Sequence, residues 1–252
     1  MSRKQRFAAI VELVNNKGEI SVDELAATFF CSVETIRRDL RYLESQGRIT
    51  RTFGKAASVR VADIGRSFEK RLDEHIAFKE IMAEKAKRLI SPGLTIALDS
   101  STSSWYLSQI LPDFHFRVVT NSMLLLKELK GKSNITLIGT GGMIDEKHGD
   151  FVASPASSSL LSGDLKIDLF FMSCIGADLA TGLYDMNEGV AFLKKEIMCR
   201  AVRNVLLADS SKFGKRTPFF ICNWSRVDYV VDDGNLGNDL LVRLHANGIN
   251  II

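Results

Sequence analysis

Residues 21–47 constrain the fold more than any other stretch, because they predict two short helices joined by a tight turn. Ser21 begins the first helix, and with Glu24 it forms a capping box in which each side chain pairs with an N–H group at the helix start. Ser32 is a good N-cap for the second helix, and Glu34 lies in its first turn, where the helix dipole favours negative charge. Apolar residues at steps of three and four give each helix one face that packs inward: Val22, Leu25, Ala26 and Phe29, then Val33, Ile36, Leu40 and Leu43.

The opposite face of the second helix is basic. It carries Thr35, Arg37, Arg38, Arg41 and Tyr42. A braced helix with guanidinium groups near its N-terminal half fits the major groove of DNA, where arginine bridges the two acceptors of guanine or binds phosphate oxygens. The alternative is an ordinary solvent-exposed face of an amphipathic helix. The helix pair by itself leaves both interpretations open.

The flanking segments favour DNA binding. A third amphipathic helix precedes the pair and ends near Lys17 and Gly18; its apolar positions are Phe7, Ile10, Val11 and Val14. After the pair, residues 47–56 alternate polar and apolar side chains and contain Gly47 and Gly54, which predicts a small hairpin with a basic tip. Three helices and a basic hairpin describe a winged helix-turn-helix, in which the tip of the hairpin meets the DNA backbone.

The charge of the chain is unevenly distributed. Residues 1–60 hold 11 lysines and arginines against 7 aspartates and glutamates, whereas residues 61–252 hold 22 against 23. The net charge of +3 therefore comes from the first quarter of the chain. A localised basic patch is what counterion release from DNA requires. A basic enzyme acting on acidic metabolites would instead carry its surplus around its active site.

Other protein classes receive little support. No apolar run is long enough to span a membrane, and the N-terminus lacks the layout of a signal peptide, so we expect a cytoplasmic protein with no membrane partner. The four cysteines have no paired spacing, so we expect neither a disulfide framework nor a zinc site, and no cofactor. A length of 252 residues leaves room for two domains, each with its own core.

The remainder of the chain predicts an α/β domain. Residues 58–75 are polar and lack sustained periodicity, which indicates a linker, although residues 68–71 could begin a helix. Beyond them we expect helices over 75–90, 102–110, 123–129 and 190–202, and strands over 95–98, 118–119, 135–139, 169–174, 205–208 and 229–231. Strands that are apolar throughout and alternate with helices predict a largely parallel sheet covered on both faces.

Four of these strands run into loops of hydroxyl, amide, glycine or lysine groups: residues 99–104, 120–122, 139–142 and 209–212. Ligands of open α/β sheets bind beyond the carboxyl ends of the strands, and such loops at helix N-termini offer donors for phosphate. Each loop alone could be only an N-cap or a turn. Four loops at one edge predict a small polyhydroxylated, phosphorylated ligand, with Lys212 as the cation for its phosphate and Asp99 as an acceptor for sugar hydroxyls.

The helix pair and the loops together resemble the DeoR family of bacterial transcription regulators. The matching residues are 32–40, Leu43, Glu44, Gly47 and Arg51, then 99–102, 120–122, 141–142, 176–178, Gly182 and 209–213, so the resemblance covers nearly the whole chain. It implies a winged helix-turn-helix over 1–57, a linker over 58–75, and over 76–252 an α/β sensor domain similar to ribose-5-phosphate isomerases and CoA transferases. It also implies a carbohydrate-utilisation regulator that binds double-stranded operator DNA as a homo-oligomer, a dimer or larger, and senses a sugar phosphate.

The resemblance and the residue patterns give two sets of site residues. We expect DNA contacts from Ser32, Glu34, Thr35, Arg37, Arg38, Arg41, Arg51 and Lys55. We expect effector contacts from Asp99, Ser100, Ser101, Thr102, Thr120, Asn121, Ser122, Gly141, Gly142, Asp178, Lys194, Asp209 and Lys212, of which Lys194 rests on the resemblance alone. Lys55 and Ser101 stand where the family has glycine. Residues 97–107 and 170–176 most resemble the family's L-fucose operon activators.

The competing hypothesis is a sugar-phosphate isomerase with an appended DNA-binding domain. Proton transfer between adjacent carbons needs a base over the substrate, usually a carboxylate. Isomerases of similar fold carry an acidic residue directly before Gly-Ala-Asp, whereas this chain has Ile175 there, which leaves Asp178 without that neighbour. We therefore expect a regulator and not an enzyme. The particular sugar, the operator sequence and the direction of regulation stay open.

Overall fold

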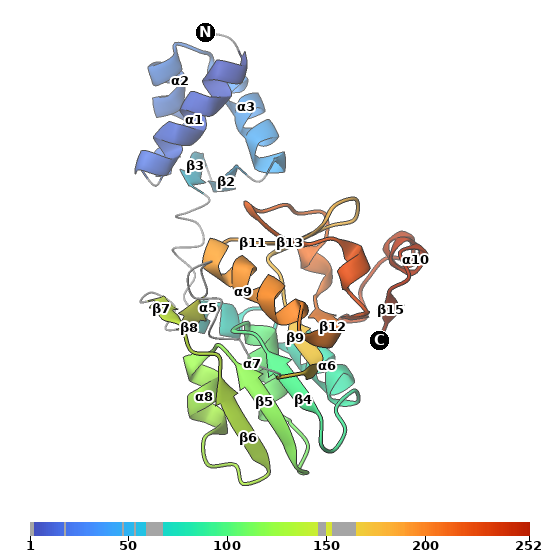
Figure 1. Ribbon diagram of the computed structural model, residues 1–252. Coiled ribbons are helices and arrows are strands. Elements are labelled where there is room, and N and C mark those ends of the chain that lie inside the picture. The colour runs from blue at the N-terminus through green and yellow to red at the C-terminus, as the bar shows by residue number, and fades with distance from the viewer. Residues whose placement is uncertain are drawn as a thin grey trace.

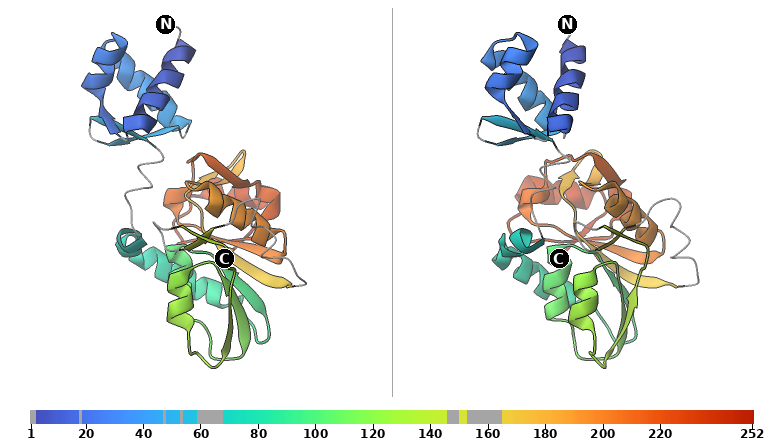
Figure 2. Two further views of the ribbon diagram at one scale, coloured as in Figure 1. Left: turned by 60° about the vertical axis from the view of Figure 1, so that its left-hand side comes forward. Right: turned by 90° about the vertical axis from the view of Figure 1, so that its left-hand side faces the viewer.

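The computed structural model describes residues 3–17, 19–46, 48–52, 54–58, 68–145, 150–152 and 165–252. Figures 1 and 2 show them from three directions as a helical N-terminal body and a larger α/β body. The N-terminal body contains α1 (Arg3–Lys17), β1 (Glu19–Ser21), α2 (Val22–Phe29), α3 (Val33–Ser45), β2 (Ile49–Thr52) and β3 (Lys55–Ser58). Among the described residues, none of the helices is both long enough and apolar enough to cross a membrane.

The three N-terminal helices form where the sequence predicts them. The Ser21 hydroxyl accepts the N–H of Glu24 at 3.1 Å, and the Ser32 hydroxyl accepts the N–H of Thr35 at 3.2 Å, so both predicted N-caps are confirmed. The predicted return bond from the Glu24 side chain is wrong, because that carboxylate pairs with Lys17 at 2.5 Å instead. The predicted apolar faces meet in one core, which includes Ile10, Val14, Leu25, Ile36, Leu40 and Leu43.

The wing is a three-stranded sheet, one strand larger than the predicted hairpin. β1 pairs antiparallel with β3, and β3 pairs antiparallel with β2. Gly54 forms the turn between β2 and β3 with a φ of 72°, and its carbonyl accepts the N–H of Val22 at 2.9 Å. The wing is therefore attached to the start of α2. Gly47 and Phe53 of the predicted hairpin lie outside the described residues.

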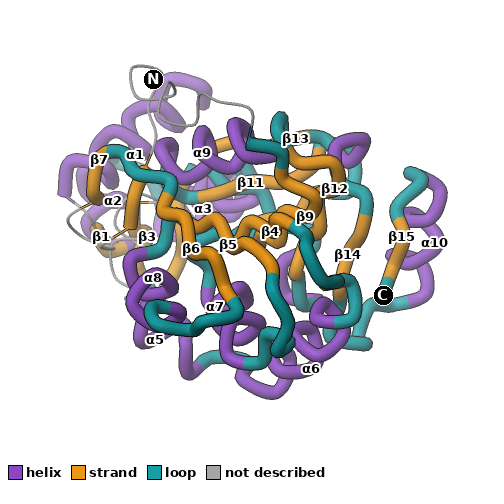
Figure 3. Tube along the Cα trace, turned by 60° about the horizontal axis from the view of Figure 1, so that its bottom comes forward, coloured by secondary structure: helices purple, strands orange, loops and turns teal. Residues whose placement is uncertain are grey.

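A seven-stranded parallel sheet organises the larger body. Its strand order is β15-β14-β12-β9-β4-β5-β6, and each neighbouring pair is parallel, as Figure 3 lets the reader follow. The strands are β4 (Thr95–Leu98), β5 (Phe116–Thr120), β6 (Ile135–Gly139), β9 (Ile167–Met172), β12 (Ala201–Leu207), β14 (Tyr229–Val231) and β15 (Asn250–Ile251). The predicted parallel sheet is confirmed.

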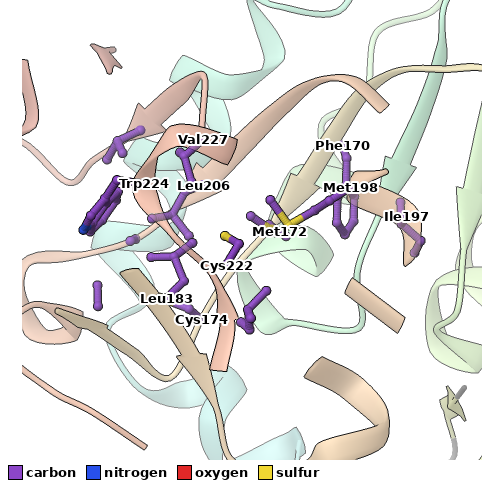
Figure 4. Close-up of a cluster of buried hydrophobic side chains, with 14 of the residues drawn as sticks. Phe170, Met172, Cys174, Leu183, Ile197, Met198, Leu206, Cys222, Trp224 and Val227 are labelled. Carbon is purple, nitrogen blue, oxygen red and sulfur yellow. The ribbon is translucent and has the colours of Figure 1, made fainter. Parts of the chain in front are cut away.

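Each face of this sheet has its own apolar core, as predicted. On one face, Ile96, Leu98 and Phe171 pack with side chains of α6 (Ile76–Lys87), α7 (Thr102–Gln109) and α8 (Met123–Leu129). On the other face, Phe170, Met172 and Leu206 pack with α9 (Glu188–Met198), with a small antiparallel sheet and with α10 (Asn238–Ala246). Figure 4 shows this second core, in which Cys174 and Cys222 lie among apolar side chains. Burial raises the pKa of both thiols to about 12.

Several elements differ from the sequence-based expectation. The helix expected over 190–202 ends at Met198, because Ala201 already pairs with Ile167 as the start of β12. The small sheet of β10 (Gly176–Asp178), β11 (Gly182–Asp185) and β13 (Phe219–Cys222) was not predicted, nor were α10, β15 and the hairpin of β7 (Met143–Asp145) and β8 (Asp150–Val152). Within the expected linker, residues 59–67 lie outside the described residues, and Phe68–Asp73 form α5.

Candidate DNA-binding face and effector site

The outer face of α3 presents free arginines. The Arg37 and Arg38 side chains are exposed, and no hydrogen bond or ion pair to any described residue holds either guanidinium. The Arg41 guanidinium pairs with Glu34 at 2.8 Å, with both side chains more than half exposed, 58% and 59%. The Ser32 and Thr35 hydroxyls bond to each other at 2.8 Å, so they complete the helix cap. Arg37 and Arg38 can therefore bind an anionic partner directly, whereas Arg41 would first have to leave its solvent-exposed pair with Glu34.

The inner side of α3 is fixed to α1 by charge. The Asp39 carboxylate is buried at 2% exposure and pairs with Arg6 at 2.6 Å and with Arg3 at 3.6 Å. Hydrogen bonding to Asp39 raises the pKa of Arg6, which keeps that guanidinium charged. Next to this pair, the Phe7 ring stacks on Tyr42 with centroids 4.9 Å apart. These contacts set the orientation of α3, and they show that Tyr42 packs on α1 although the sequence placed it on the basic face.

The wing adds two cations beside α3. The Arg51 guanidinium lies 3.4 Å from the Glu44 carboxylate, so β2 is tied to the C-terminal part of the helix. Lys55 follows the Gly54 turn at the start of β3, and its side chain is exposed. The predicted DNA-binding residues therefore come from one helix and one hairpin of the same small body.

In the larger body, the topology brings the four predicted loops to one edge. β12, β4, β5 and β6 are parallel members of one sheet, and each predicted loop follows the carboxyl end of one of them. β9 lies between β12 and β4, so residues 173–174 join the same edge. Convergence of these loops, expected from the strand pattern alone, follows directly from the parallel pairing.

Asp99 organises the loop after β4. Its Oδ1 accepts the hydroxyls of Ser101 and Ser104, each at 2.6 Å. Its Oδ2 accepts the N–H of Ser173 at 2.9 Å and faces Lys194 at 3.2 Å. Both carboxylate oxygens are thus occupied and the side chain is buried. Asp99 therefore stabilises the N-terminus of α7 and can accept few hydrogen bonds from sugar hydroxyls, the role expected for it.

Lys194 reaches the same edge from α9. Its ammonium donates to the Ser173 carbonyl at 2.7 Å and to Asp185 at 2.7 Å, in addition to the Asp99 contact. Burial by itself lowers the pKa of Lys194, but the charges of Asp185 and Asp99 outweigh it and raise that pKa. All three ammonium protons have acceptors within the protein, so Lys194 joins three segments of the edge.

The loops after β5 and β6 are held by their own polar groups. The Asn121 amide donates to the Ser100 hydroxyl at 3.2 Å and to the Phe151 carbonyl at 3.0 Å, which connects the loop after β4 with β8. Thr120 accepts the N–H of Ser122 at 3.1 Å, and the Ser122 hydroxyl caps α8. Thr102 is buried in the first turn of α7. Gly141 and Gly142 have φ values of 64° and 120°, which side chains with a Cβ rarely adopt.

Among the described residues, Lys212 is a cation of this edge without a hydrogen-bond or ion-pair partner. It ends a short 3-10 helix, Ser210–Lys212, which Asp209 caps by accepting the N–H of Ser211 at 2.9 Å. No described residue forms a hydrogen bond or an ion pair with the Lys212 ammonium. Its charge lowers the pKa values of both Lys79 and Cys174, so Lys212 lies within electrostatic range of α6 and of the end of β9.

Two further cations near Lys212 were missed by the sequence analysis. Lys79 of α6 is buried, and its ammonium donates to the carbonyls of Arg71, Leu72 and Glu74 at the end of α5. Burial, reinforced by the charge of Lys212, lowers the pKa of Lys79 to about 8. The Nε atom of Arg71 is buried without a hydrogen-bond partner. Arg71, Lys79 and Lys212 thus form one cationic cluster. Its only signal in the sequence was Lys79, a lysine within the apolar pattern of α6.

Asp178 belongs to a different arrangement. It ends β10, and its Oδ1 accepts the N–H and hydroxyl of Thr181 and the guanidinium of Arg216 at 3.0 Å. The hydrogen bond from Arg216 is the main reason why the pKa of Asp178 falls to about 2. The Oδ1 atom is thus occupied by residues of its own turn and by Arg216, which precedes β13, and these contacts give the expected role in ligand binding no support.

Comparisons with known proteins match both bodies. Residues 6–61 match the family model described as a DeoR-like helix-turn-helix domain, and residues 74–234 match the model described as the DeoR C terminal sensor domain. The two matches leave out residues 1–5, 62–73 and 235–252, and the last of these ranges contains α10 and β15.

Relatives share most of the chain. The HTH-type transcriptional regulator YulB of Bacillus subtilis, described as uncharacterized, is 38% identical over 92% of this chain and 89% of its own length. A protein of Escherichia coli named L-fucose operon activator is 38% identical over 90% of this chain and 94% of its own length. Among solved structures, ribose 5-phosphate isomerase A of Methanocaldococcus jannaschii has a TM-score of 0.39, with 18% identity over 54% of this chain and 53% of its own.

Proposed function

The chain belongs to the DeoR family of transcriptional regulators, and we propose that it controls a carbohydrate-utilisation operon in response to a sugar phosphate bound at the carboxyl edge of its parallel sheet. The observation that carries the DNA-binding part is the outer face of α3. Arg37 and Arg38 have no ion-pair partner among the described residues, and the inner side of their helix is fixed by Asp39. A rigid helix with uncommitted guanidinium groups can enter a major groove without first breaking its own ion pairs.

The effector part rests on the cationic cluster of Arg71, Lys79 and Lys212. Burial is the main reason why the pKa of Lys79 is lowered, and the positive charges of Lys212 and Arg71 lower it further, so the three cations repel one another. A dianionic phosphate relieves the repulsion and accepts hydrogen bonds from the Lys212 ammonium and the Arg71 Nε, for which the described residues provide no partner. The N-termini of α7 and α8 at the same edge supply N–H groups for the remaining oxygens.

The remaining edge residues act mainly as a scaffold. Contacts of Asp99 and Lys194 with Ser173 join the loop after β4 to the loop after β9. A shift of either loop should therefore also move α7 and α9. A ligand alters DNA binding only if it binds the DNA-competent state and the other state with different affinity. We propose that the ligand changes how two copies of the chain present their α3 helices to the half-sites of one operator.

The link to carbohydrate metabolism comes from the relatives. The Escherichia coli relative is named for the L-fucose operon, and it matches this chain over most of both lengths. Fucose-derived phosphates are therefore the first ligands to test. The same fold also serves isomerases, but an isomerase needs a poised base. A carboxylate such as Asp178, with a pKa of about 2 and its Oδ1 bound by Arg216, is a poor one.

Two experiments test the proposal. Fluorescence anisotropy with duplexes from the promoters near its gene measures operator affinity, and its dependence on salt counts the phosphate contacts. A thermal-shift screen across phosphorylated and unphosphorylated sugars identifies the effector, because a ligand that prefers the native state raises the melting temperature. A protein that binds no duplex at low salt contradicts the DNA-binding part. A screen in which only unphosphorylated sugars shift the melting temperature contradicts the phosphate part.

A further inference from the structure

Phe30 is the most exposed large apolar residue of the described chain, with 95% of its surface accessible. It lies in the turn between α2 and α3, and its backbone is left-handed with a φ of 51°. An aromatic residue in this conformation is an uncommon outlier, because its Cβ crowds the backbone. Exposure of the ring to water and strain in the backbone both oppose this arrangement, and no contact with a described side chain offsets them.

The turn holds Phe30 in place from both sides. The N–H of Phe30 bonds to the carbonyls of Ala26 and Ala27, and the N–H of Cys31 bonds to Ala26 at 3.0 Å. Phe29 before it and Cys31 after it pack against the N-terminal core. With both neighbours packed inward, the turn directs the Phe30 ring outward.

The position of the turn relative to α3 decides what the ring can meet. Phe30 precedes the N-cap Ser32 by two residues and therefore lies at the N-terminal end of α3. Recognition helices of this motif contact base edges with their N-terminal residues. The free Arg37 and Arg38 guanidiniums on the same helix attract DNA to it. When α3 enters the groove, the exposed ring enters with its leading end.

We propose that Phe30 is a specificity-determining residue that contacts the methyl group of a thymine in the major groove of the operator. The inference rests on the proposed DNA-binding function and extends it to one base contact that the arginines cannot make. The thymine methyl is the apolar group that the major groove presents, and a phenylalanine ring is a suitable partner for it. Contact with DNA removes the ring from water, which recovers the cost of its exposure in the free protein.

The test compares thymine with uracil, which lacks only the methyl group. Full-length protein first selects a duplex from a random-sequence pool, and each thymine of the selected site is then replaced singly by deoxyuridine. The wild-type chain should lose about fourfold in affinity at one position of each half-site, the fold-change expected for burying one methyl group. The Phe30→Gly variant should bind the thymine and uracil duplexes equally well at that position.

His75 provides a matched control. It is the other described residue besides glycine with a positive φ, 55°, and it lies in the larger body at the start of α6. His75→Gly relieves the same kind of backbone strain and should keep the wild-type response to uracil. Phe30→Gly should keep the circular dichroism spectrum and should not lower the melting temperature, because glycine suits the left-handed turn.

The outcomes separate the two proposals. Failure of the wild-type chain to select any duplex overturns the proposed DNA-binding function, and this inference falls with it. Selection of a duplex whose uracil substitutions have the same effect on the wild-type and Phe30→Gly chains overturns this inference alone. Loss of uracil sensitivity in Phe30→Gly but not in His75→Gly supports the thymine contact.

Discussion

The Arg6 guanidinium lies 2.6 Å from the Asp39 carboxylate, and this ion pair joins α1 to the buried side of α3. Removing Asp39 leaves the partly buried Arg6 without its main partner. We expect Asp39→Ala to lower the free energy of unfolding of the N-terminal body by about 1.5–3 kcal/mol, the range for a hydrogen bond to a charged group. Thermal unfolding followed by circular dichroism measures it. Glu34→Ala, which breaks only the exposed pair with Arg41, should cost less than about 1 kcal/mol.

Arg37→Ala and Arg38→Ala should weaken operator binding by about 1–3 kcal/mol each without changing the fold. Anisotropy titrations over a range of salt concentrations distinguish two roles. An arginine that binds phosphate lowers the salt slope by about one and acts on all sequences, whereas one that binds guanine relaxes specificity at one position. Arg243→Ala on α10 removes the same charge from the larger body and serves as the control. Unchanged affinities and salt slopes for both variants contradict the role assigned to α3.

Lys212→Ala should blunt the effector response and leave DNA binding intact. The Lys212 ammonium has no partner among the described residues, so its removal should change the stability of the fold little. It should weaken binding of the phosphate strongly. Calorimetry with the sugar phosphate from the thermal-shift screen should show an affinity lower by at least about tenfold, as for one charge-assisted contact. Lys215→Ala, an exposed lysine three residues on, is the matched control. Equal affinities for the wild-type and Lys212→Ala chains overturn the phosphate role.

We expect the lowered pKa of Lys79 to make both the stability of the fold and the proposed effector response depend on pH. Its pKa of about 8 in the folded protein is below the ordinary value of 10.5, so between these pH values it is charged mainly in the unfolded chain. The penalty for burying the charged amine therefore acts fully below pH 8 and fades as the pH rises to 10.5, so this group alone makes stability increase with pH in that window.

Anion binding has the opposite dependence, because a nearby phosphate favours the charged amine. Affinity for the sugar phosphate should fall as the pH rises through about 8, and binding at pH 8.5 should take up a proton. Calorimetry in buffers with different ionisation enthalpies measures this proton uptake. Lys79→Met should remove it. An affinity that stays flat between pH 7 and 9.5 would count against electrostatic coupling between Lys79 and the ligand.

Lys194→Met should destabilise the larger body strongly. The substitution leaves Asp99 and Asp185 buried without their shared cation, and breaking a buried ion pair from one side costs about 3–5 kcal/mol. Urea unfolding measures this loss. Lys195→Met changes the next residue, which is exposed, and should cost about 1 kcal/mol or less. Similar midpoints for the two variants would mean that Lys194 is not the centre of the network.

The sequence predicted most of what depends on neighbouring residues. The Ser21 and Ser32 caps and the apolar steps along α3 are local patterns, so they identified the helix-turn-helix and its basic face directly. Apolar strands alternating with helices predicted the parallel sheet, and parallel pairing alone then places the polar loops after β4, β5, β6 and β12 at one edge. Both inferences need only the spacing of apolar residues along the chain and the regular geometry of helices and parallel strands.

The tertiary structure decided everything that depends on distant residues. Helical spacing continued past Met198, and only pairing with β9 turned Ala201 into a strand residue. Asp99 looked like a free acceptor until Ser173 and Lys194, 74 and 95 positions away, were seen to occupy it. The same holds for the cluster of Arg71, Lys79 and Lys212. Charges interact through space, so a sequence can name the groups of such a site, but only the fold brings them close enough to shift a pKa or to bind an anion.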